Sequence, residues 1–212
     1  MMNKQMVQKI IDRLYEHYQP IMSLEFTNPW ELLVATILSA QARDEKVNQV
    51  TKRLFVLFPK PIDFTNGSLE SIEKTISSLN YYRSKAKHIY ESARIIQSQY
   101  NGKVPQTMEE LTSLPGVARK TANVVLNIAF NQSVGIVVDT HVLRLSNRLG
   151  FIQQQDREKA EIELMKVIPK KNWIDISLLL IHHGRAQCTA RNPSCDICYL
   201  RDLCPSFDDP KK

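Results

Sequence analysis

Two helical patterns of apolar residues meet at the stretch Leu111-Thr112-Ser113-Leu114-Pro115-Gly116-Val117-Ala118-Arg119-Lys120-Thr121-Ala122. A proline followed by a glycine marks a tight turn, so this stretch predicts a helix, a hairpin and a second helix. Such a turn exposes backbone amides at the start of the second helix, where the macrodipole also favours a phosphate. We therefore expect a helix-hairpin-helix that holds a nucleic-acid backbone without reading base sequence, although a generic turn between helices could carry the same two residues.

The rest of the chain shows the same helical spacing. Apolar stripes run over 30–38, 86–93 and 122–130, and the first and third have further apolar residues beside the stripe, so both should be buried nearly all round. Only six glycines occur in 212 residues, which also favours helices over sheets, and we predict an all-α fold. An apolar run over 134–138 could be extended chain or the lead-in to a helix. Breaks between helices are expected at Pro20, 59–67, 101–105, 131–135 and Gly150.

Composition and charge limit the class of protein. Hydrophobic residues make up 43% and charged residues 24%, which excludes a disordered or fibrous chain, and no stretch is long enough to span a membrane. Residues 1–9 show no secretory signal, so we expect a cytoplasmic protein. A net charge of +6 is compatible with a nucleic-acid partner, because neutralised phosphates release counterions. Basic residues scattered over solvated helices would give the same excess.

The cysteines form one group near the end of the chain. Four thiols in so short a segment of a cytoplasmic protein are poorly explained by disulfides, so we expect a tetrathiolate metal site. Zinc and a [4Fe-4S] cluster both bind four cysteines, and the pattern itself leaves both open. The ligands would be Cys188, Cys195, Cys198 and Cys204, with six, two and five residues between them.

Several of these segments resemble the endonuclease III family of DNA repair enzymes. The cysteine spacing is similar to the family's cluster loop at all four positions, residues 114–130 resemble its hairpin and following helix, and residues 138–142 resemble its catalytic aspartate motif. The likeness extends from about Asn28 to Cys204. It implies a [4Fe-4S] cluster with a structural role, and two helical lobes with the active-site cleft between them. The lobes would comprise residues 22–132, with the hairpin, and residues 1–21 plus 133–212, with the cluster loop.

The resemblance also implies an activity. It predicts a bifunctional DNA glycosylase and AP lyase of base excision repair, acting as a monomer on double-stranded DNA with damaged bases, chiefly oxidised pyrimidines, or abasic sites. Lys120 would attack C1′ of the sugar, expel the base and leave a Schiff base from which β-elimination nicks the strand. Asp139 would stay ionised and stabilise the positive charge that builds on the sugar. Without the resemblance, Lys120 would be interpreted as a surface lysine and Asp139 as an ordinary N-cap.

The same resemblance assigns contacts with DNA, which would associate the protein with the bacterial nucleoid. Gln41 would fill the gap left by an extruded nucleotide, while Arg185 and Arg191 would lie against phosphates or remain solvated charges. Basic residues over 83–94 either follow phosphates or form a solvated helix face; they are Arg83, Lys85, Lys87 and Arg94. The contacts expected in the hairpin and the next helix turn are Leu114, Gly116, Val117, Ala118, Arg119 and Thr121.

The chain departs from the family's pattern at three positions. Ala118 stands where a second hairpin glycine is common, and a left-handed backbone there would cost ~1 kcal/mol. Arg43 replaces a small residue beside Gln41, and Asn80 stands where relatives often have glycine. The first departure bears on the detailed geometry of the hairpin.

Three other functions are compatible with parts of this pattern. A monofunctional mismatch glycosylase would remove a base with an aspartate and water and would not nick the strand, but Lys120 argues against it. A non-catalytic DNA-binding module could be built on the same hairpin. A redox protein could use the cluster to carry electrons.

Overall fold

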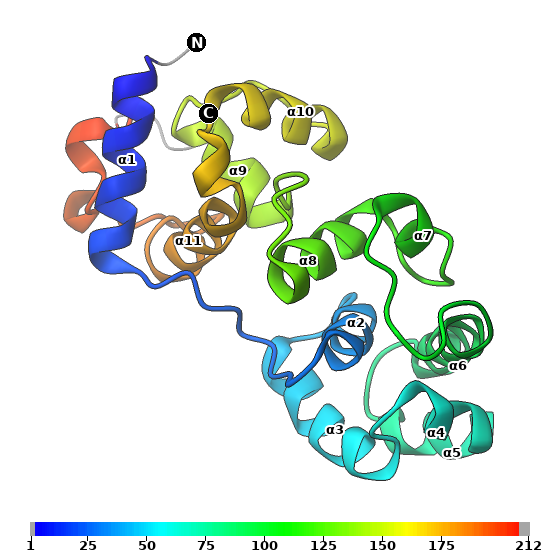
Figure 1. Ribbon diagram of the computed structural model, residues 1–212. Helices are drawn as coiled ribbons and strands as arrows, with labels where there is room; N and C mark the ends of the chain where they lie inside the picture. Colours follow the sequence, from blue (N-terminus) through cyan, green and yellow to red (C-terminus); the bar gives the residue numbers. More distant parts are fainter. Residues whose placement is uncertain (1–2, 208–212) are drawn as a thin grey trace. The chain divides into compact units, whose positions relative to one another are not determined.

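The computed structural model describes residues 3–207, and within that range the chain forms helices and no strand (Figure 1). The all-α fold expected from the glycine count and the apolar stripes is confirmed. No helix in this range is both long and apolar enough to cross a membrane. The α-helices are α1 (Lys4–His17), α2 (Pro29–Leu38), α3 (Asp44–Leu57), α4 (Pro61–Asn66), α5 (Leu69–Ile76), α6 (Tyr82–Gln99), α7 (Met108–Thr112), α8 (Arg119–Phe130), α9 (Thr140–Arg148), α10 (Arg157–Val167) and α11 (Trp173–Ala186). Short 3-10 helices are η1 (Lys170–Asn172), η2 (Cys195–Ile197) and η3 (Arg201–Leu203).

The chain divides into two compact units, one formed by Met1–Ile21 with Ser133–Lys212 and the other by Met22–Gln132. We call the first the cluster unit, because it contains the four cysteines, and the second the hairpin unit. Each unit has a hydrophobic core of its own. A compact unit needs such a core, because burial of apolar surface is the main term that offsets the entropy of ordering the chain.

The hairpin unit is organised around α2, α6 and α8. Helix α8 packs on α2 and α7, while α6 packs on α2, α4 and α5. Helix α2 is buried over most of its length, as expected from its extra apolar residues, since Trp30 and nearly every residue from Leu32 to Leu38 lie in the core. For α8 the expectation is right only over Ala122–Asn127, because residues 128–130 at its end are half-buried.

A short helix lies where the sequence suggested a break over residues 59–67. Helix α4 begins with Pro61, whose fixed φ and missing amide suit the first helical position. The carboxylate of Asp63 accepts the Lys60 amide at 2.8 Å, and Phe64 is fully buried. The expected break was therefore wrong, because proline and polar residues that read as a loop begin a helix here.

Residues 134–138 form no helix or strand and lead the chain into α9, which agrees with the expected lead-in to a helix. Ile136, Val137 and Val138 are buried. Ile136 and Val138 join the core of the cluster unit, so this extended segment is anchored by its apolar side chains. It delivers the chain directly to Asp139 at the start of α9.

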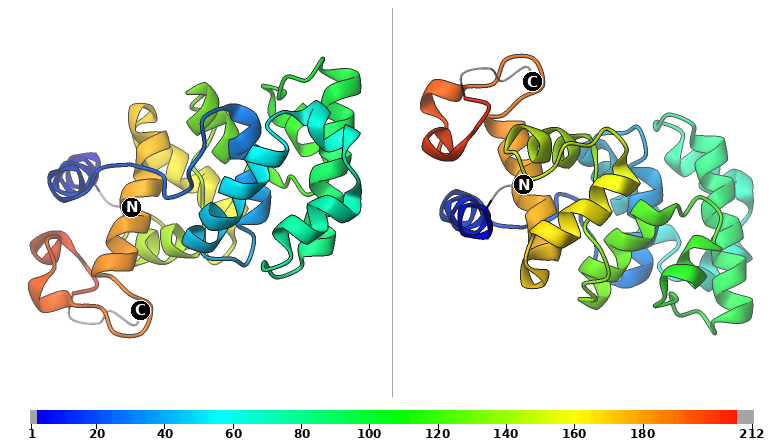
Figure 2. Two further views of the ribbon diagram at one scale, coloured as in Figure 1. Left: turned by 90° about the horizontal axis from the view of Figure 1, so that it is seen from below. Right: turned by 90° about the horizontal axis from the view of Figure 1, so that it is seen from above.

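In the cluster unit, α11 packs against α1 and α9 (Figures 1 and 2). The approach of α9 is close at Gly184, where an added Cβ would lie 3.0 Å from the His141 ring and 3.1 Å from both Arg144 and Leu145. Any larger residue at this position would therefore require these side chains of α9 to shift. The residues between Cys188 and Cys204, which we call the cluster loop, follow the end of α11.

Candidate active site and iron-sulfur centre

The hairpin between α7 and α8 is held by contacts with α6. Gly116 adopts a left-handed backbone with φ of 76°, and a Cβ there would lie only 2.8–2.9 Å from atoms of His88. The Ser92 hydroxyl donates to the Pro115 carbonyl at 3.1 Å, which fixes the other side of the turn. Both the conformation and the close approach therefore require glycine at 116.

Ala118 is not strained. It is the N-cap of α8 with φ of −81° and ψ of 168°, an extended conformation that any residue adopts. The left-handed residue of the hairpin is Gly116, so alanine in place of a second glycine carries no left-handed penalty. Ala118 has no side chain that could cap the helix, and it makes no side-chain capping bond.

The residues expected to contact DNA in the hairpin fall into two groups. The side chains of Leu114 and Val117 are buried in the core, so these residues can offer DNA only their backbone. Gly116, Ala118 and Arg119 are exposed, and Thr121 is half-buried. An exposed helix start with a basic side chain beside it is the kind of place at which proteins often bind phosphate.

Lys120 is the second residue of α8, and it is exposed. Its amine therefore stands in the first turn, directly after the hairpin, where a bound phosphate would bring the sugar of a nucleotide nearby. Nothing in the packing of the hairpin unit requires an exposed lysine at this position. The sequence placed Lys120 in the first turn of this helix, and its exposure is also what the alternative of a surface lysine would give.

Asp139 is the N-cap of α9. Its Oδ1 accepts the Val142 amide at 2.8 Å, and its backbone carbonyl accepts the Leu143 amide at 2.9 Å. The residue is half-buried, so part of the carboxylate remains accessible. Burial lowers the pKa of the neighbouring His141, while the negative charge of Asp139 opposes that shift. Asp139 therefore caps α9 and still keeps part of its carboxylate accessible, and the sequence was compatible with both roles.

Gln41 lies in the turn between α2 and α3. It is exposed and left-handed, with φ of 52°, and the Ala42 amide closes the turn on the Ser39 carbonyl at 3.1 Å. Arg43, in place of the small residue usual in the family, is the exposed N-cap of α3 and makes no side-chain capping bond. The turn therefore presents the Gln41 side chain away from the core.

Lys85 does not follow phosphates, contrary to one of the two interpretations of the basic stretch over 83–94. It is only 5% exposed, and its Nζ donates to the Leu38 carbonyl at 2.8 Å. Burial lowers the pKa of Lys85. The lysine caps the last carbonyl of α2, where a positive charge complements the helix dipole. Its role is structural, and it supports the end of α2 just before the Gln41 turn.

The four cysteines surround one pocket of the cluster unit. The thiols are free and partly buried, and the pocket encloses about 440 Å³ including space open to solvent. Within residues 3–207 no three His, Cys, Asp or Glu side chains converge as they would on a single bound ion. The Arg148 guanidinium donates to Cys188 Sγ at 3.3 Å. Four thiols around one pocket, with a guanidinium aimed at one of the sulfurs, fit an iron-sulfur cluster.

Burial raises the pKa of the thiols of Cys198 and Cys204, so protein surroundings alone favour the neutral form. A metal centre reverses this preference, because coordination removes the thiol proton outright. Assembly of the cluster should therefore be accompanied by release of protons. Arg185, in the last turn of α11, and Arg191, within the cluster loop, are both exposed.

Several residues around the cluster loop were not predicted. Arg144 donates to the Cys188 carbonyl at 2.9 Å, and Arg148 donates to the Thr189 carbonyl at 2.7 Å and the Ala190 carbonyl at 3.0 Å. Both arginines lie on α9, more than one helix before the cysteines in the sequence. No local pattern connects them to the loop, so only the fold could show these contacts.

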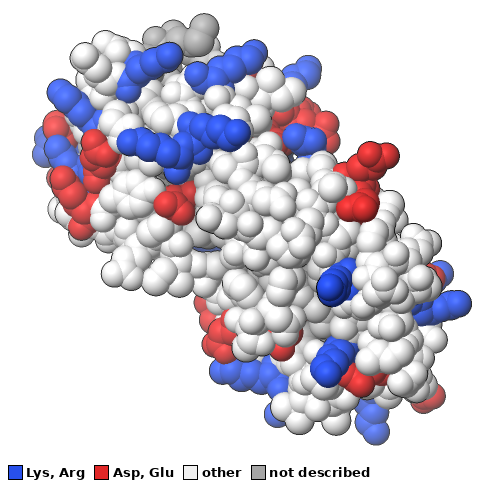
Figure 3. Space-filling view, viewed as in Figure 1, with Lys and Arg blue, Asp and Glu red and all other residues white. Residues whose placement is uncertain are grey.

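Lys and Arg side chains are mixed with acidic ones on the face drawn in Figure 3, and the largest basic gathering on that face lies on the cluster unit. Basic residues gathered on one face favour phosphate binding more than the same number scattered over the surface.

The fold and these sites match a known class of protein. A family model described as HhH-GPD superfamily base excision DNA repair protein matches residues 34–170, and one described as the iron-sulfur binding domain of endonuclease III matches residues 188–204. The endonuclease III of Synechocystis is 51% identical over 87% of this chain and 84% of its own length. That of Escherichia coli K12 is 42% identical over 96% of both chains.

Solved structures agree with this class. A non-covalent endonuclease III–DNA complex matches with a TM-score of 0.91 and 41% identity, covering 98% of both chains. A trapped endonuclease III–DNA covalent intermediate matches with the same TM-score and identity over 100% of both chains. The chain belongs to the HhH-GPD superfamily of base excision DNA repair proteins and, within it, to the endonuclease III family.

Membership settles the choices left open by the sequence. The protein is a DNA-binding enzyme of base excision repair with DNA glycosylase and AP lyase activity. Its cofactor is a [4Fe-4S] cluster, not zinc, and the matched segment contains Cys188, Cys195, Cys198 and Cys204. When bound, the cluster would cross-link the loop that contains the four cysteines, which has little regular structure of its own.

Proposed function

We propose that Lys120 is the nucleophile of the reaction. Its amine would attack C1′ of the damaged nucleotide, the bond from C1′ to the base would break, and the base would leave with a proton. The C1′–O4′ bond would then break, with O4′ taking up a proton, to give a Schiff base between the amine nitrogen and C1′. Loss of a C2′ proton from this Schiff base would expel the 3′ phosphate. The observation that carries this assignment is the exposed amine in the first turn of α8, directly after the phosphate-binding hairpin.

Asp139 is the carboxylate that stabilises the reaction. As the base departs, positive charge builds on the sugar, and an ionised carboxylate held in place by a helix N-terminus opposes that charge. The Val142 amide fixes Oδ1 and leaves the second oxygen for the substrate. Lys120 belongs to the hairpin unit and Asp139 to the cluster unit, so their convergence on one nucleotide is itself part of the proposal.

The remaining predicted contacts would position the DNA. Backbone amides of the hairpin would bind one phosphate, and Arg185 and Arg191 would neutralise others. The exposed, left-handed turn that presents Gln41 would let its side chain enter the space of the extruded nucleotide. The contacts in the hairpin region are those of Leu114, Gly116, Val117, Ala118, Arg119 and Thr121.

The substrate we propose is duplex DNA that contains an oxidised pyrimidine or an abasic site. Binding is expected from a monomer, because each unit has its own core and the hairpin and cluster loop can both be supplied by one chain. We place the protein in the bacterial cytoplasm, associated with the nucleoid through DNA. A panel of duplexes with single defined lesions would measure the preference among pyrimidines.

Borohydride trapping tests the Lys120 assignment. Wild-type protein incubated with an abasic-site duplex and borohydride should form a covalent complex, and Lys120→Ala should form none while keeping its DNA affinity. Lys74→Ala is the matched control, because Lys74 is also an exposed helical lysine of the hairpin unit. Active wild-type protein that released bases but was never trapped would instead support a monofunctional glycosylase.

A further inference from the structure

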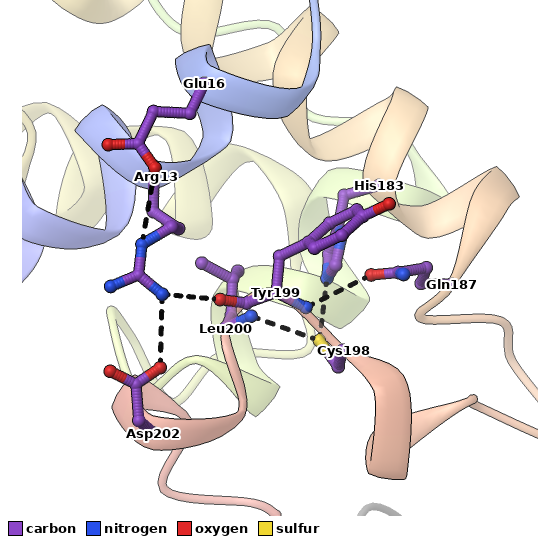
Figure 4. A network of polar contacts seen from close by, with 8 residues as sticks. All are labelled: Arg13, Glu16, His183, Gln187, Cys198, Tyr199, Leu200 and Asp202. Carbon is purple, nitrogen blue, oxygen red and sulfur yellow. Dashed lines mark hydrogen bonds and ion pairs between the residues drawn. The ribbon is translucent and has the colours of Figure 1, made fainter.

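Helix α1 is attached to the cluster loop by polar contacts, drawn in Figure 4, and by an aromatic stack. The Arg13 guanidinium donates to the Tyr199 carbonyl at 2.9 Å and to the Asp202 carboxylate at 3.3 Å. The His17 ring stacks on Tyr199 with centroids 3.5 Å apart. These contacts hold the segment that immediately follows Cys198, although α1 and the loop are about as far apart in sequence as the chain allows.

The end of α1 continues this attachment to the sulfur of Cys198. Tyr18, the C-cap of α1, has its hydroxyl 3.1 Å from Nδ1 of His183. Nε2 of the same ring lies 3.5 Å from Cys198 Sγ, and His183 is only 2% exposed. Tyrosine, histidine and cysteine therefore form one chain of polar contacts, with the imidazole enclosed between the other two.

The chemistry of a cluster ligand fixes the direction of these hydrogen bonds. A cysteine sulfur bound to iron has lost its proton and can only accept, so the ring nitrogen that faces it must be the one that carries hydrogen. A neutral imidazole then has its lone pair on Nδ1, and the Tyr18 hydroxyl must donate to it. The Leu200 amide also donates to Cys198 Sγ, at 3.4 Å, so this sulfur accepts two N–H groups.

We propose that His183, held in its Nε2–H form by Tyr18, donates to the Cys198 sulfur and thereby raises the reduction potential of the cluster. Reduction adds one electron to the cluster and increases the negative charge on its sulfurs, so an N–H dipole aimed at a sulfur stabilises the reduced form more than the oxidised form. No proton moves between His183 and Cys198 in this couple, and in the measurement the electron comes from an electrode. The proposal does not depend on Lys120 or Asp139.

Voltammetry of the purified, cluster-containing protein without DNA tests the proposal. His183→Leu should shift the potential to a more negative value, and His183→Gln, whose amide can still donate, should recover part of the difference. Tyr18→Phe should give a smaller negative shift, because it frees the other tautomer of His183. Tyr15→Phe should give none, since that hydroxyl on the same helix donates to Asp175 at 2.7 Å and not toward a cysteine. Equal potentials for wild type and His183→Leu, with iron content unchanged, would overturn the proposal.

A second measurement needs no substitution, in case the His183 variants do not retain the cluster. Nuclear magnetic resonance of wild-type protein with ¹⁵N-labelled histidine reports which ring nitrogen of His183 carries hydrogen. The Nε2–H tautomer is expected. The Nδ1–H tautomer would leave a lone pair facing the sulfur and would rule out the hydrogen bond.

Discussion

Gly116 has a left-handed backbone and no room for a side chain, and only glycine satisfies both conditions. Its φ of 76° lies in the left-handed region, and the His88 ring occupies the place of a side chain. Ala118, two residues later, has neither constraint. The hairpin therefore depends on one glycine, and the second glycine common in the family is dispensable in this chain.

Gly116→Ala should weaken both folding and DNA binding. A left-handed backbone costs a residue with a Cβ roughly 1–2 kcal/mol, and displacement of His88 adds to that. The melting temperature should fall by several degrees, since about 1 kcal/mol corresponds to roughly 2–4 °C in a chain of this size. Ala118→Gly is the control and should change the melting temperature and DNA affinity little. A similar loss in both variants would contradict the assignment of strain to Gly116 alone.

Tyr18 should make the stability of the cluster unit depend on pH in the alkaline range. Burial raises the pKa of Tyr18 from 10.0 to about 12. The folded protein therefore holds this proton where the unfolded chain has lost it, and stability decreases as pH rises from about 10 to about 12. Melting temperatures measured by circular dichroism should fall less steeply over this range for Tyr18→Phe than for wild type. Parallel curves would show that the hydroxyl stays protonated equally in both states.

Helix α9 carries both the carboxylate that we propose for catalysis and two arginines that hold the cluster loop. Its N-terminus is capped by Asp139, and its side chains Arg144 and Arg148 bind carbonyls of the cluster loop. The same carboxylate that starts the helix is the one we propose for the reaction. Substitutions at 139 can separate these two roles, because asparagine caps a helix as well as aspartate does.

Asp139→Asn should leave stability nearly unchanged while slowing base release. The amide oxygen can still accept the Val142 amide, but the negative charge opposite the sugar is lost. Loss of such an electrostatic group typically reduces the rate on the order of 10²–10³-fold. Asp139→Ala should in addition lower stability by about 1 kcal/mol through loss of the cap. Single-turnover release from a lesion duplex, with melting curves for both variants, makes the comparison. Full activity of Asp139→Asn would exclude the electrostatic role.

Helices and turns were predicted correctly where a few adjacent residues determine them. They were predicted poorly where packing against distant residues determines the structure. The Pro-Gly hairpin and the capped start at Asp139 depend on a few adjacent residues. The break expected over 59–67 was wrong because Pro61 begins a helix whose Phe64 fills the core, and residues 134–138 form an extended segment whose burial depends on distant partners.

For the molecule as a whole, the sequence was sufficient to predict the family and the cofactor, because the four cysteines lie within one short segment. Contacts between distant residues could not be predicted. Tyr18 with His183 and Lys85 with Leu38 are separated by 165 and 47 residues, and each residue alone has an ordinary interpretation. Helix α1, which has no motif of its own, proves to be the support of the cluster loop.

Whether Lys120 is the nucleophile can be decided by identifying the residue that becomes covalently joined to DNA. Wild-type protein trapped with borohydride on an abasic-site duplex can be digested with protease and nuclease, and the modified peptide sequenced by mass spectrometry. We predict one adduct, on the side chain of Lys120. An adduct on another lysine or on the terminal amine, with Lys120 unmodified, would show that Lys120 is not the nucleophile.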